Sequence, residues 1–144
     1  MATLVEINDA VNRLIKGLLE PVGEDLWQTP QETIQLGTGD CEDLAILKYI
    51  LARRAGYDAK VLAVQVAGYG AHVVCLIQSG KHKWILDNLA TEIVELDARL
   101  GVDILKLISV SSEGMPHNDP RFDDMMARGV DHQIVGEFEK KAGL

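Results

Sequence analysis

The first part of the chain carries hydrophobic residues three and four positions apart, the period of an amphipathic helix. They are Leu4, Ile7, Val11, Leu14, Ile15 and Leu18. The spacing predicts a helix over residues 3–20. A second, short helix is predicted to follow, because Thr29 is a suitable N-cap, Pro30 suits the first helical position and Glu32 completes a capping box. This helix is expected to stop near Gly37.

The next helix is predicted to begin at Cys41 and to lie at the centre of the fold. Residues 37–40 indicate a turn, in which Asp40 is well suited to cap the helix. The positions that follow are broadly apolar and include Leu44, Ile46, Leu47, Ile50 and Leu51. Such a pattern is typical of a helix buried on most sides. Arg53 and Arg54 favour its C-terminal end, where the helix dipole is negative.

The second half of the chain changes to alternating, valine-rich segments, which predict strands. These segments cover residues 59–67, 71–78, 82–88, 92–96 and 104–110, although residues 105–107 would also suit a helix. The second and third form a predicted hairpin around Ser79 and Gly80. Residues 111–120 are rich in turn formers, and residues 121–141 are charged and weakly helical. Helices followed by antiparallel strands predict an α+β domain.

Composition narrows the class of protein further. The chain has 144 residues, of which 47% are hydrophobic and 25% charged, as expected for one globular domain over residues 1–144. A net charge of −8 argues against nucleic acid as a partner. No apolar segment is long enough to span a membrane. No signal peptide is visible, so we expect a cytoplasmic protein, or a periplasmic one if a leader has been removed.

The chain has only two cysteines, which excludes a disulfide-rich scaffold and a four-cysteine zinc site. Cys41 lies at a predicted helix start, where unpaired N–H groups favour a thiolate and could hold an oxyanion. The alternative is a small buried core residue. Cys75 lies on the same predicted strand as His72 but faces the other side, so we expect it to be a core thiol.

The predicted hairpin brings a histidine close to a carboxylate. With a two-residue turn at Ser79 and Gly80, His72 lies directly opposite Asp87, with β-carbons about 4.5–5.5 Å apart. With a four-residue turn, His72 faces Leu89 and Asp87 becomes a diagonal neighbour. A carboxylate at hydrogen-bonding distance would fix the tautomer of the histidine. Cys41, His72 and Asp87 are therefore candidates for a nucleophile, a base and an orienting group.

These residues lie in a pattern that resembles the bacterial transglutaminase-like cysteine peptidases. The pattern consists of Trp27-x-Thr29-Pro30-x-Glu32, Gly39-Asp40-Cys41-Glu42-Asp43-Leu44-Ala45, Ala71-His72-Val73-Val74 and Leu86-Asp87-Asn88. It covers residues 25–90, whereas residues 111–144 form a C-terminal extension that the pattern does not assign. The resemblance implies a papain-like or transglutaminase-like core, in which the cysteine helix packs on an antiparallel sheet. It also implies that Cys41 is the nucleophile, His72 the general base and Asp87 its orienting partner.

The resemblance also implies calcium, held by Asp40 and Glu42. Acids beside a thiol raise its pKa, and a hard cation bound to their oxygens would relieve that effect. The alternative stays open, because Asp40 could simply cap the helix while Glu42 and Asp43 favour its positive end. No organic cofactor is expected. Gln28 is a candidate oxyanion donor, since related papain-like enzymes place a polar donor upstream of the nucleophile.

Three functions are compatible with this sequence. The first is a cysteine hydrolase, an endopeptidase that cleaves a protein or peptide through a thioester acyl-enzyme. The second is amide transfer, as in a transglutaminase, through the same triad. The third is a non-catalytic module that binds calcium or protein on the same fold. Residues 111–144 are a candidate contact for a protein partner.

Overall fold

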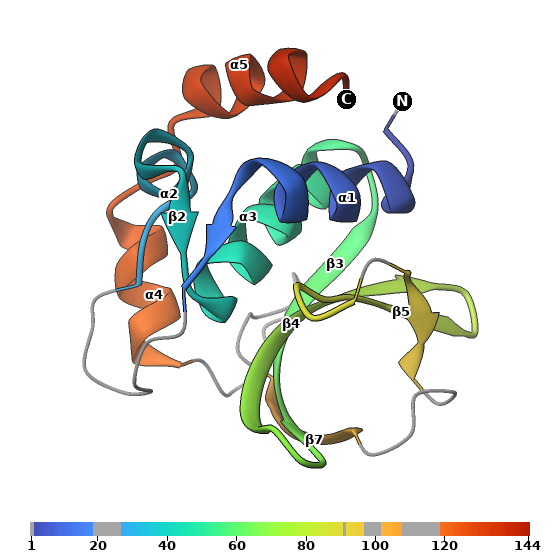
Figure 1. Ribbon diagram of the computed structural model, residues 1–144. Helices are drawn as coiled ribbons and strands as arrows, with labels where there is room; N and C mark the ends of the chain where they lie inside the picture. The colour runs from blue at the N-terminus through green and yellow to red at the C-terminus, as the bar shows by residue number, and fades with distance from the viewer. Residues whose placement is uncertain (1, 19–26, 91, 97–101, 108–118) are drawn as a thin grey trace.

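The computed structural model describes residues 2–18, 27–90, 92–96, 102–107 and 119–144. Its elements are, in chain order, α1 (Leu4–Leu14), β1 (Lys16–Gly17), α2 (Pro30–Leu36), β2 (Thr38–Gly39), α3 (Cys41–Arg54), β3 (Asp58–Val66), β4 (Gly70–Ser79), β5 (His82–Leu86), β6 (Val94–Glu95), β7 (Val102–Leu107), α4 (Pro120–Ala127) and α5 (His132–Ala142). In Figure 1, α1, α2, α3 and α5 gather on one side of a curled sheet. This arrangement confirms the α+β fold class.

Helix α3 lies at the centre of the fold, as the apolar pattern predicts. It is buried without interruption from Asp43 to Ala52. Asp40 caps its first turn in a capping box with Asp43, so the helix begins at Cys41 for the local reason that the sequence indicates. One face of α3 packs against α1 and α2 and another against β3 and β4. Any side chain at its first turn is therefore held by the core.

The main sheet has five strands in the order β6-β5-β4-β3-β7, and all neighbours are antiparallel. Side chains alternate between its two faces. Val61, Cys75 and Ile77 join the main core with α3, whereas Leu62, Val64, Val74, Leu76, Ile85 and Leu96 form a second cluster. Cys75 has no exposed surface, which confirms that it is a core thiol.

The prediction for the first helix is wrong at its C-terminal end. Helix α1 ends at Leu14, because Ile15 takes an extended conformation with φ −111° and ψ 122°. Lys16 and Gly17 then pair in parallel with Thr38 and Gly39. The segment that was predicted to be a turn before Cys41 is thus a short strand. This pairing ties the start of α3 to the end of α1 through backbone hydrogen bonds.

The register of the hairpin also differs from the tighter of the two alternatives. Ser79 pairs with His82 and Cys75 pairs with Leu86. This is the register in which Asp87 lies diagonal to His72. Strand β5 ends at Leu86, so Asp87 lies beyond the ladder and its position is not fixed by the pairing of β4 with β5.

The C-terminal part forms two helices rather than one weakly helical stretch. Helices α4 and α5 are separated at Gly129, whose φ of 88° favours glycine. The link between them is tied to α2, because Gln31 Nε2 donates to Gly129 O at 2.9 Å and Gln31 Oε1 accepts from Asp131 N at 3.1 Å. The C-terminal segment is thus joined to α2 by hydrogen bonds. Its predicted role as a contact for a protein partner stays a prediction.

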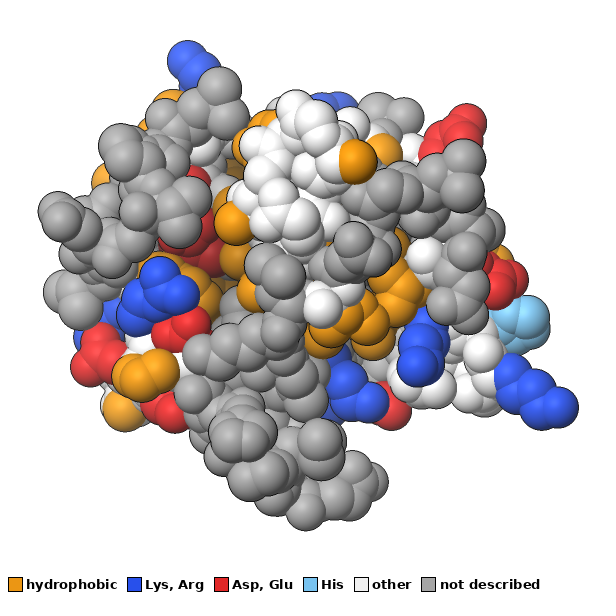
Figure 2. All heavy atoms as spheres, turned by 90° about the horizontal axis from the view of Figure 1, so that it is seen from below, with side chains coloured by type: hydrophobic (Ala, Val, Ile, Leu, Met, Phe, Trp, Pro, Cys, Tyr) orange, Lys and Arg blue, Asp and Glu red, His pale blue; other side chains and the backbone are white. Residues whose placement is uncertain are grey.

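The surface is mixed in character. Figure 2 views the molecule from below and shows hydrophobic side chains reaching the surface, with Lys and Arg in separate groups and not in one patch. Exposed large hydrophobic residues include Tyr69, Leu89 and Ile104. In the part of the chain that the structure describes, every helix is too short or too polar to cross a bilayer.

Candidate active site

Cys41 opens α3 and borders a cavity of about 120 Å³. The residues that line this cavity are Trp27, Cys41, Glu42, Ala63, Ala71, His72, Val73 and Arg121. They come from the segment before α2, from α3, β3 and β4, and from α4. The thiol is half-buried, and Cys41 Sγ donates to Glu42 Oε2 at 3.4 Å. The cavity therefore joins the cysteine to the histidine strand.

His72 and Asp87 form a buried hydrogen-bonded pair. The distance between His72 Nε2 and Asp87 Oδ1 is 2.7 Å, and the two side chains are 0% and 2% exposed. Asp87 Oδ1 also accepts from Leu89 N at 3.0 Å, which holds the carboxylate after the end of β5. The structure thus brings together the two residues that the hairpin argument paired, although through the diagonal register.

The second ring nitrogen of His72 remains available. His72 Nδ1 is buried and has no hydrogen-bond partner among the described atoms, and His72 lines the same cavity as Cys41. Because Asp87 accepts from Nε2–H, Nδ1 is the nitrogen without a proton when the ring is neutral. Tyr69 packs edge-on against the ring, with centroids 5.3 Å apart. The imidazole is oriented with one basic nitrogen left over.

The charges around Cys41 oppose ionisation of its thiol. Burial, followed by the charge of Glu42, raises the pKa of Cys41 to about 12, while the backbone amide of Val73 acts in the opposite direction. The sequence left open whether the helix terminus or the neighbouring acids would dominate. In this arrangement the acids and burial dominate, so the resting thiol is protonated at neutral pH.

The acids of the first turn also perturb one another. Burial and the neighbouring Asp40 raise the pKa of Glu42 to about 7 and that of Asp43 to about 8. Asp43 is nonetheless tied down, since its Oδ1 accepts from Gln28 N at 3.0 Å and its Oδ2 from Asp40 N at 3.2 Å. Asp40 Oδ1 accepts from Asp43 N at 3.3 Å, and Glu42 Oε2 accepts from the Cys41 thiol. Crowded carboxylates of this kind mark functional sites more often than stable surfaces.

The structure gives less support to the predicted calcium ligands, Asp40 and Glu42, and to the predicted oxyanion donor, Gln28, than to the pair of His72 and Asp87. Within the described ranges, no group of three or more His, Cys, Asp or Glu side chains is arranged to hold a metal ion. Gln28 accepts from Thr33 Oγ1 at 2.9 Å and is not among the described residues that line the cavity. Trp27 lines it instead. Gln28 contributes through its backbone amide, which fixes Asp43 and hence the start of α3.

Sequence reasoning missed Arg121, which reaches the cavity from the C-terminal segment. Its guanidinium lies 4.6 Å from the centre of the Trp27 ring. Nothing in the local sequence around Arg121 announces this contact, because it joins residues far apart in the chain. A basic residue just after an Asp-Pro helix start was the available signal, and it is weak.

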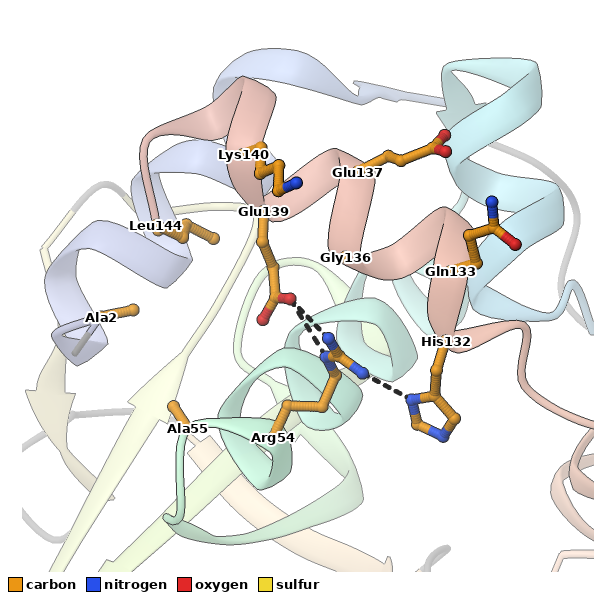
Figure 3. A pocket seen from close by; sticks show the side chains of 10 residues that line it. All are labelled: Ala2, Arg54, Ala55, His132, Gln133, Gly136, Glu137, Glu139, Lys140 and Leu144. Atoms are coloured by element: carbon orange, nitrogen blue, oxygen red, sulfur yellow. Dashed lines mark hydrogen bonds and ion pairs between the residues drawn. The ribbon is translucent and has the colours of Figure 1, made fainter.

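A larger cavity lies at the other end of α3. It has a volume of about 760 Å³ and is lined by Arg54, His132 and Glu139, together with seven further residues that Figure 3 labels. Arg54 donates to Glu139 Oε1 from Nε at 3.2 Å and from Nη2 at 2.7 Å, and its Nη1 lies 2.7 Å from His132 Nδ1. Arg54, Glu139 and His132 thus bond to one another, and none of the described lining residues is a cysteine.

The fold places a cysteine at the start of a central helix and a buried histidine–carboxylate pair on the sheet that this helix packs against, with the cysteine and the histidine lining one cavity. The family model of the bacterial transglutaminase-like cysteine proteinases matches residues 1–99. The chain therefore belongs to this family of cysteine peptidases. A comparison with curated proteins gave no match.

Solved structures of LapG from Legionella pneumophila are similar to this chain. The calcium-bound form has a TM-score of 0.73 and 23% identity, with 87% of this chain and 77% of that chain covered. Another LapG structure has a TM-score of 0.71 and 26% identity, with 87% and 76% covered. An EGTA-treated form has a TM-score of 0.71 and 24% identity over the same shares of the two chains. These likenesses confirm the transglutaminase-like fold, including the cysteine helix on an antiparallel sheet.

Proposed function

We propose that this protein is an endopeptidase in which Cys41 is the nucleophile, His72 the general base and Asp87 the group that orients His72. The observation that supports this most strongly is the state of His72. One ring nitrogen is bonded to a buried carboxylate at 2.7 Å, and the other is unpartnered and belongs to a residue that lines the cavity of Cys41. A purely structural histidine would be expected to satisfy both nitrogens when buried.

The chemistry follows from these positions. His72 Nδ1 takes the proton from Cys41 Sγ, and the sulfur attacks the carbonyl carbon of the substrate. The protonated His72 then gives its proton to the leaving amine nitrogen, which leaves a thioester on Cys41. Water, deprotonated by His72, attacks the thioester and releases the acid. Asp87 stabilises the imidazolium in both halves of the cycle.

The developing oxyanion needs donors close to the sulfur. The backbone amide of Cys41 lies in the first turn of α3, where amides are not used by the helix and carry partial positive charge. Gln28 is retained as the candidate side-chain donor. It would have to release Thr33 to serve in this role.

Two alternatives use the same fold. An amine acceptor in place of water would make the enzyme a transferase, and the geometry of the triad is equal for both reactions. A module without turnover is less compatible with the site, because binding alone does not need a base with a free nitrogen beside a thiol. Incubation of a cleaved substrate with a primary amine, followed by mass spectrometry, separates hydrolysis from transfer.

We propose in addition that calcium is held by Asp40 and Glu42. Carboxylate oxygens are the ligands that calcium prefers. Burial and the neighbouring Asp40 raise the pKa of Glu42, and a bound cation would favour its ionised form. The calcium-bound form of LapG supports this proposal. Calcium, when bound, supplies positive charge beside the thiol.

Melting temperature against calcium concentration tests this second proposal. We expect a saturable rise in the parent, its loss in Asp40→Asn, and its retention in Asp58→Asn, which removes a carboxylate on the exposed start of β3. Magnesium at the same concentration controls for general ion effects. Equal curves for the parent and Asp40→Asn would contradict the assignment.

The endopeptidase proposal is tested by cleavage of unfolded casein. We expect the parent to produce fragments. The Cys75→Ala variant, which keeps Cys41, should also produce them, and the Cys41→Ala variant should produce none. Mass spectrometry of the quenched parent should show an acyl group on Cys41. Cleavage by Cys41→Ala at the rate of the parent would refute the role of this residue.

A further inference from the structure

Helix α4, which lies in the C-terminal part of the chain, contributes a charged residue to the cavity of Cys41. Arg121 lies in its first turn and lines the cavity together with Cys41 and His72. It lies outside residues 1–99, which the family model matches. The guanidinium is therefore a property of this chain that the family assignment does not explain.

Two side chains, the carboxylate of Asp119 and the ring of Trp27, hold Arg121 in one orientation. Its Nε and Nη2 donate to Asp119 Oδ1 and Oδ2 at 2.9 and 2.7 Å, and its guanidinium stacks on Trp27 at 4.6 Å. Asp119 is 3% exposed and Trp27 is also 3% exposed. A guanidinium fixed in this way loses little further conformational freedom when it binds a ligand.

The helix that carries Arg121 is anchored to the same segment as Trp27. Arg128, at the end of α4, donates to the backbone carbonyl of Trp27 through Nη2 and to Glu32 Oε1 through Nη1 at 2.9 Å. Both ends of α4 therefore contact the Trp27–Glu32 region. The contacts that dock α4 against residues 27–32 therefore also place Arg121 at the cavity.

One edge of the guanidinium remains unused. A guanidinium has five N–H donors, and Asp119 occupies only the edge formed by Nε and Nη2. Among the described residues, the edge formed by Nη1 and the second Nη2 hydrogen has no hydrogen-bond partner, and the side chain is 41% exposed. This second fork matches a carboxylate, the acceptor with which arginine forms its strongest paired hydrogen bonds.

We propose that Arg121 is a specificity residue that binds an acidic side chain of the peptide next to the scissile bond. This inference rests on the proposed peptidase function, because it places the ligand in the cleft of Cys41. Among the described residues that line the cavity, Glu42 carries the opposing charge. Its carboxyl accepts from the Cys41 thiol at 3.4 Å.

The test uses short, blocked, alanine-rich peptides that carry either Glu or its isostere Gln at each position in turn. At one position, we expect the parent to cleave the Glu peptide with a kcat/KM about tenfold above that of the Gln peptide. Arg121→Gln should abolish this ratio, so that the Glu and Gln peptides are cleaved with equal kcat/KM. Arg121→Lys keeps the charge without the fork and should retain part of the preference.

The matched control is Arg13→Gln, which removes one positive charge from an exposed pair on α1 and should leave the ratio unchanged. A parent without preference at any position would overturn the proposal. So would a loss in Arg121→Gln that is equal for the Glu and Gln peptides, which would indicate a contact with the peptide backbone or a structural role. Melting temperatures of both Arg121 variants show whether α4 still docks.

Failure of the peptidase function has a different signature. If the parent cleaves none of the peptides, binding of the same Glu and Gln peptides is measured by calorimetry on the parent and on Arg121→Gln. Tighter binding of a Glu peptide that is lost in the variant supports Arg121 as a carboxylate site without turnover. Equal binding by both proteins contradicts it.

Discussion

The two ends of helix α3 are built on opposite electrostatic plans. At the C-terminal end, Arg54 meets Glu139 and His132, and every close polar pair is complementary. At the N-terminal end, Asp40, Glu42 and Asp43 crowd the turn at which Cys41 begins the helix, and the pKa values of Glu42, Asp43 and Cys41 are all raised. The larger cavity lies at the complementary end, and the smaller one at the crowded end.

The difference shows that the N-terminal end of α3 carries charge interactions that lower the stability of the fold. Acids near a helix N-terminus normally stabilise it, but here burial and mutual repulsion outweigh that gain. A fold keeps such a conflict where the groups have a task. The cavity at Arg54 is the larger of the two, but the buried ring nitrogen without a partner among the described residues belongs to His72, which lines the cavity of Cys41.

The largest expected effect separates the two histidines that lie at the two ends. His72→Ala removes the unpartnered nitrogen beside Cys41, and we expect kcat/KM to fall about a thousandfold. His132→Ala removes a contact with Arg54 at the other end and should leave kcat/KM unchanged. Peptide hydrolysis by both variants is the measurement. A comparable loss in both would remove the functional distinction between the ends.

A buried lysine between the two ends predicts a stability effect. Lys48 is 1% exposed, and burial lowers its pKa from 10.5 to about 8, with Cys75 and Asp87 acting in the opposite direction. This difference corresponds to about 3 kcal/mol. Lys48→Met removes the buried charge and should raise the free energy of unfolding at pH 7 by up to about that amount.

The pH dependence of Lys48 has a definite sign. Between about pH 8 and 10.5 the unfolded chain binds the proton that the folded chain has released, so the stability of the parent should rise with pH in this window. The rise should be absent in Lys48→Met. Urea unfolding from pH 7 to pH 10.5 measures both effects, and parallel curves for the two proteins would contradict the assignment.

Asp87 offers a graded test at the crowded end. Asp87→Ala should lower kcat/KM about a hundredfold, because His72 loses the partner that sets its tautomer. Asp87→Asn should lose less, since its amide oxygen can still accept from Nε2. The ratio of the two variants at a single pH is the readout. Equal losses would show that the charge of Asp87, and not its hydrogen bond, is what matters.

The smallest effect is expected at the complementary end. Arg54→Ala breaks a pair whose side chains are 27% and 25% exposed, and we expect a loss of about 1 kcal/mol in stability with no change in kcat/KM. Arg13→Ala, which breaks an exposed i,i+4 pair with Asp9, is the matched control and should cost about 0.5 kcal/mol or less. A loss of activity in Arg54→Ala would contradict the division between the ends.

Local signals in the sequence predicted much of this arrangement. The capping box at Thr29 and Glu32 fixed the start of α2, and Asp40 fixed the start of α3. Both depend on residues a few positions apart, which a sequence displays directly. The order of strands β3, β4 and β5 followed from alternation and from the turn at Gly80.

Features that depend on distant contacts were not predictable in the same way. The C-terminal end of α1 is set by pairing with β2, and the periodicity of the helix gives no sign of it. The burial of Lys48 and the stacking of Arg121 on Trp27 join segments that come together only in the fold. The pair of His72 and Asp87 was predicted, but the favoured register was wrong, and the diagonal alternative was the correct one.

The most direct test of the account is the reaction of Cys41 with iodoacetamide, followed by mass spectrometry of the intact chain, with buried Cys75 as the internal reference. If His72 activates the thiol, Cys41 should label selectively in the parent at neutral pH, and at least about tenfold more slowly in His72→Ala. His72 is buried and paired with Asp87, so the variant should melt at a lower temperature than the parent, and labelling is measured below both melting transitions. Labelling of Cys41 at the same rate in the parent and in His72→Ala would contradict the central claim that these two residues act as one nucleophilic unit.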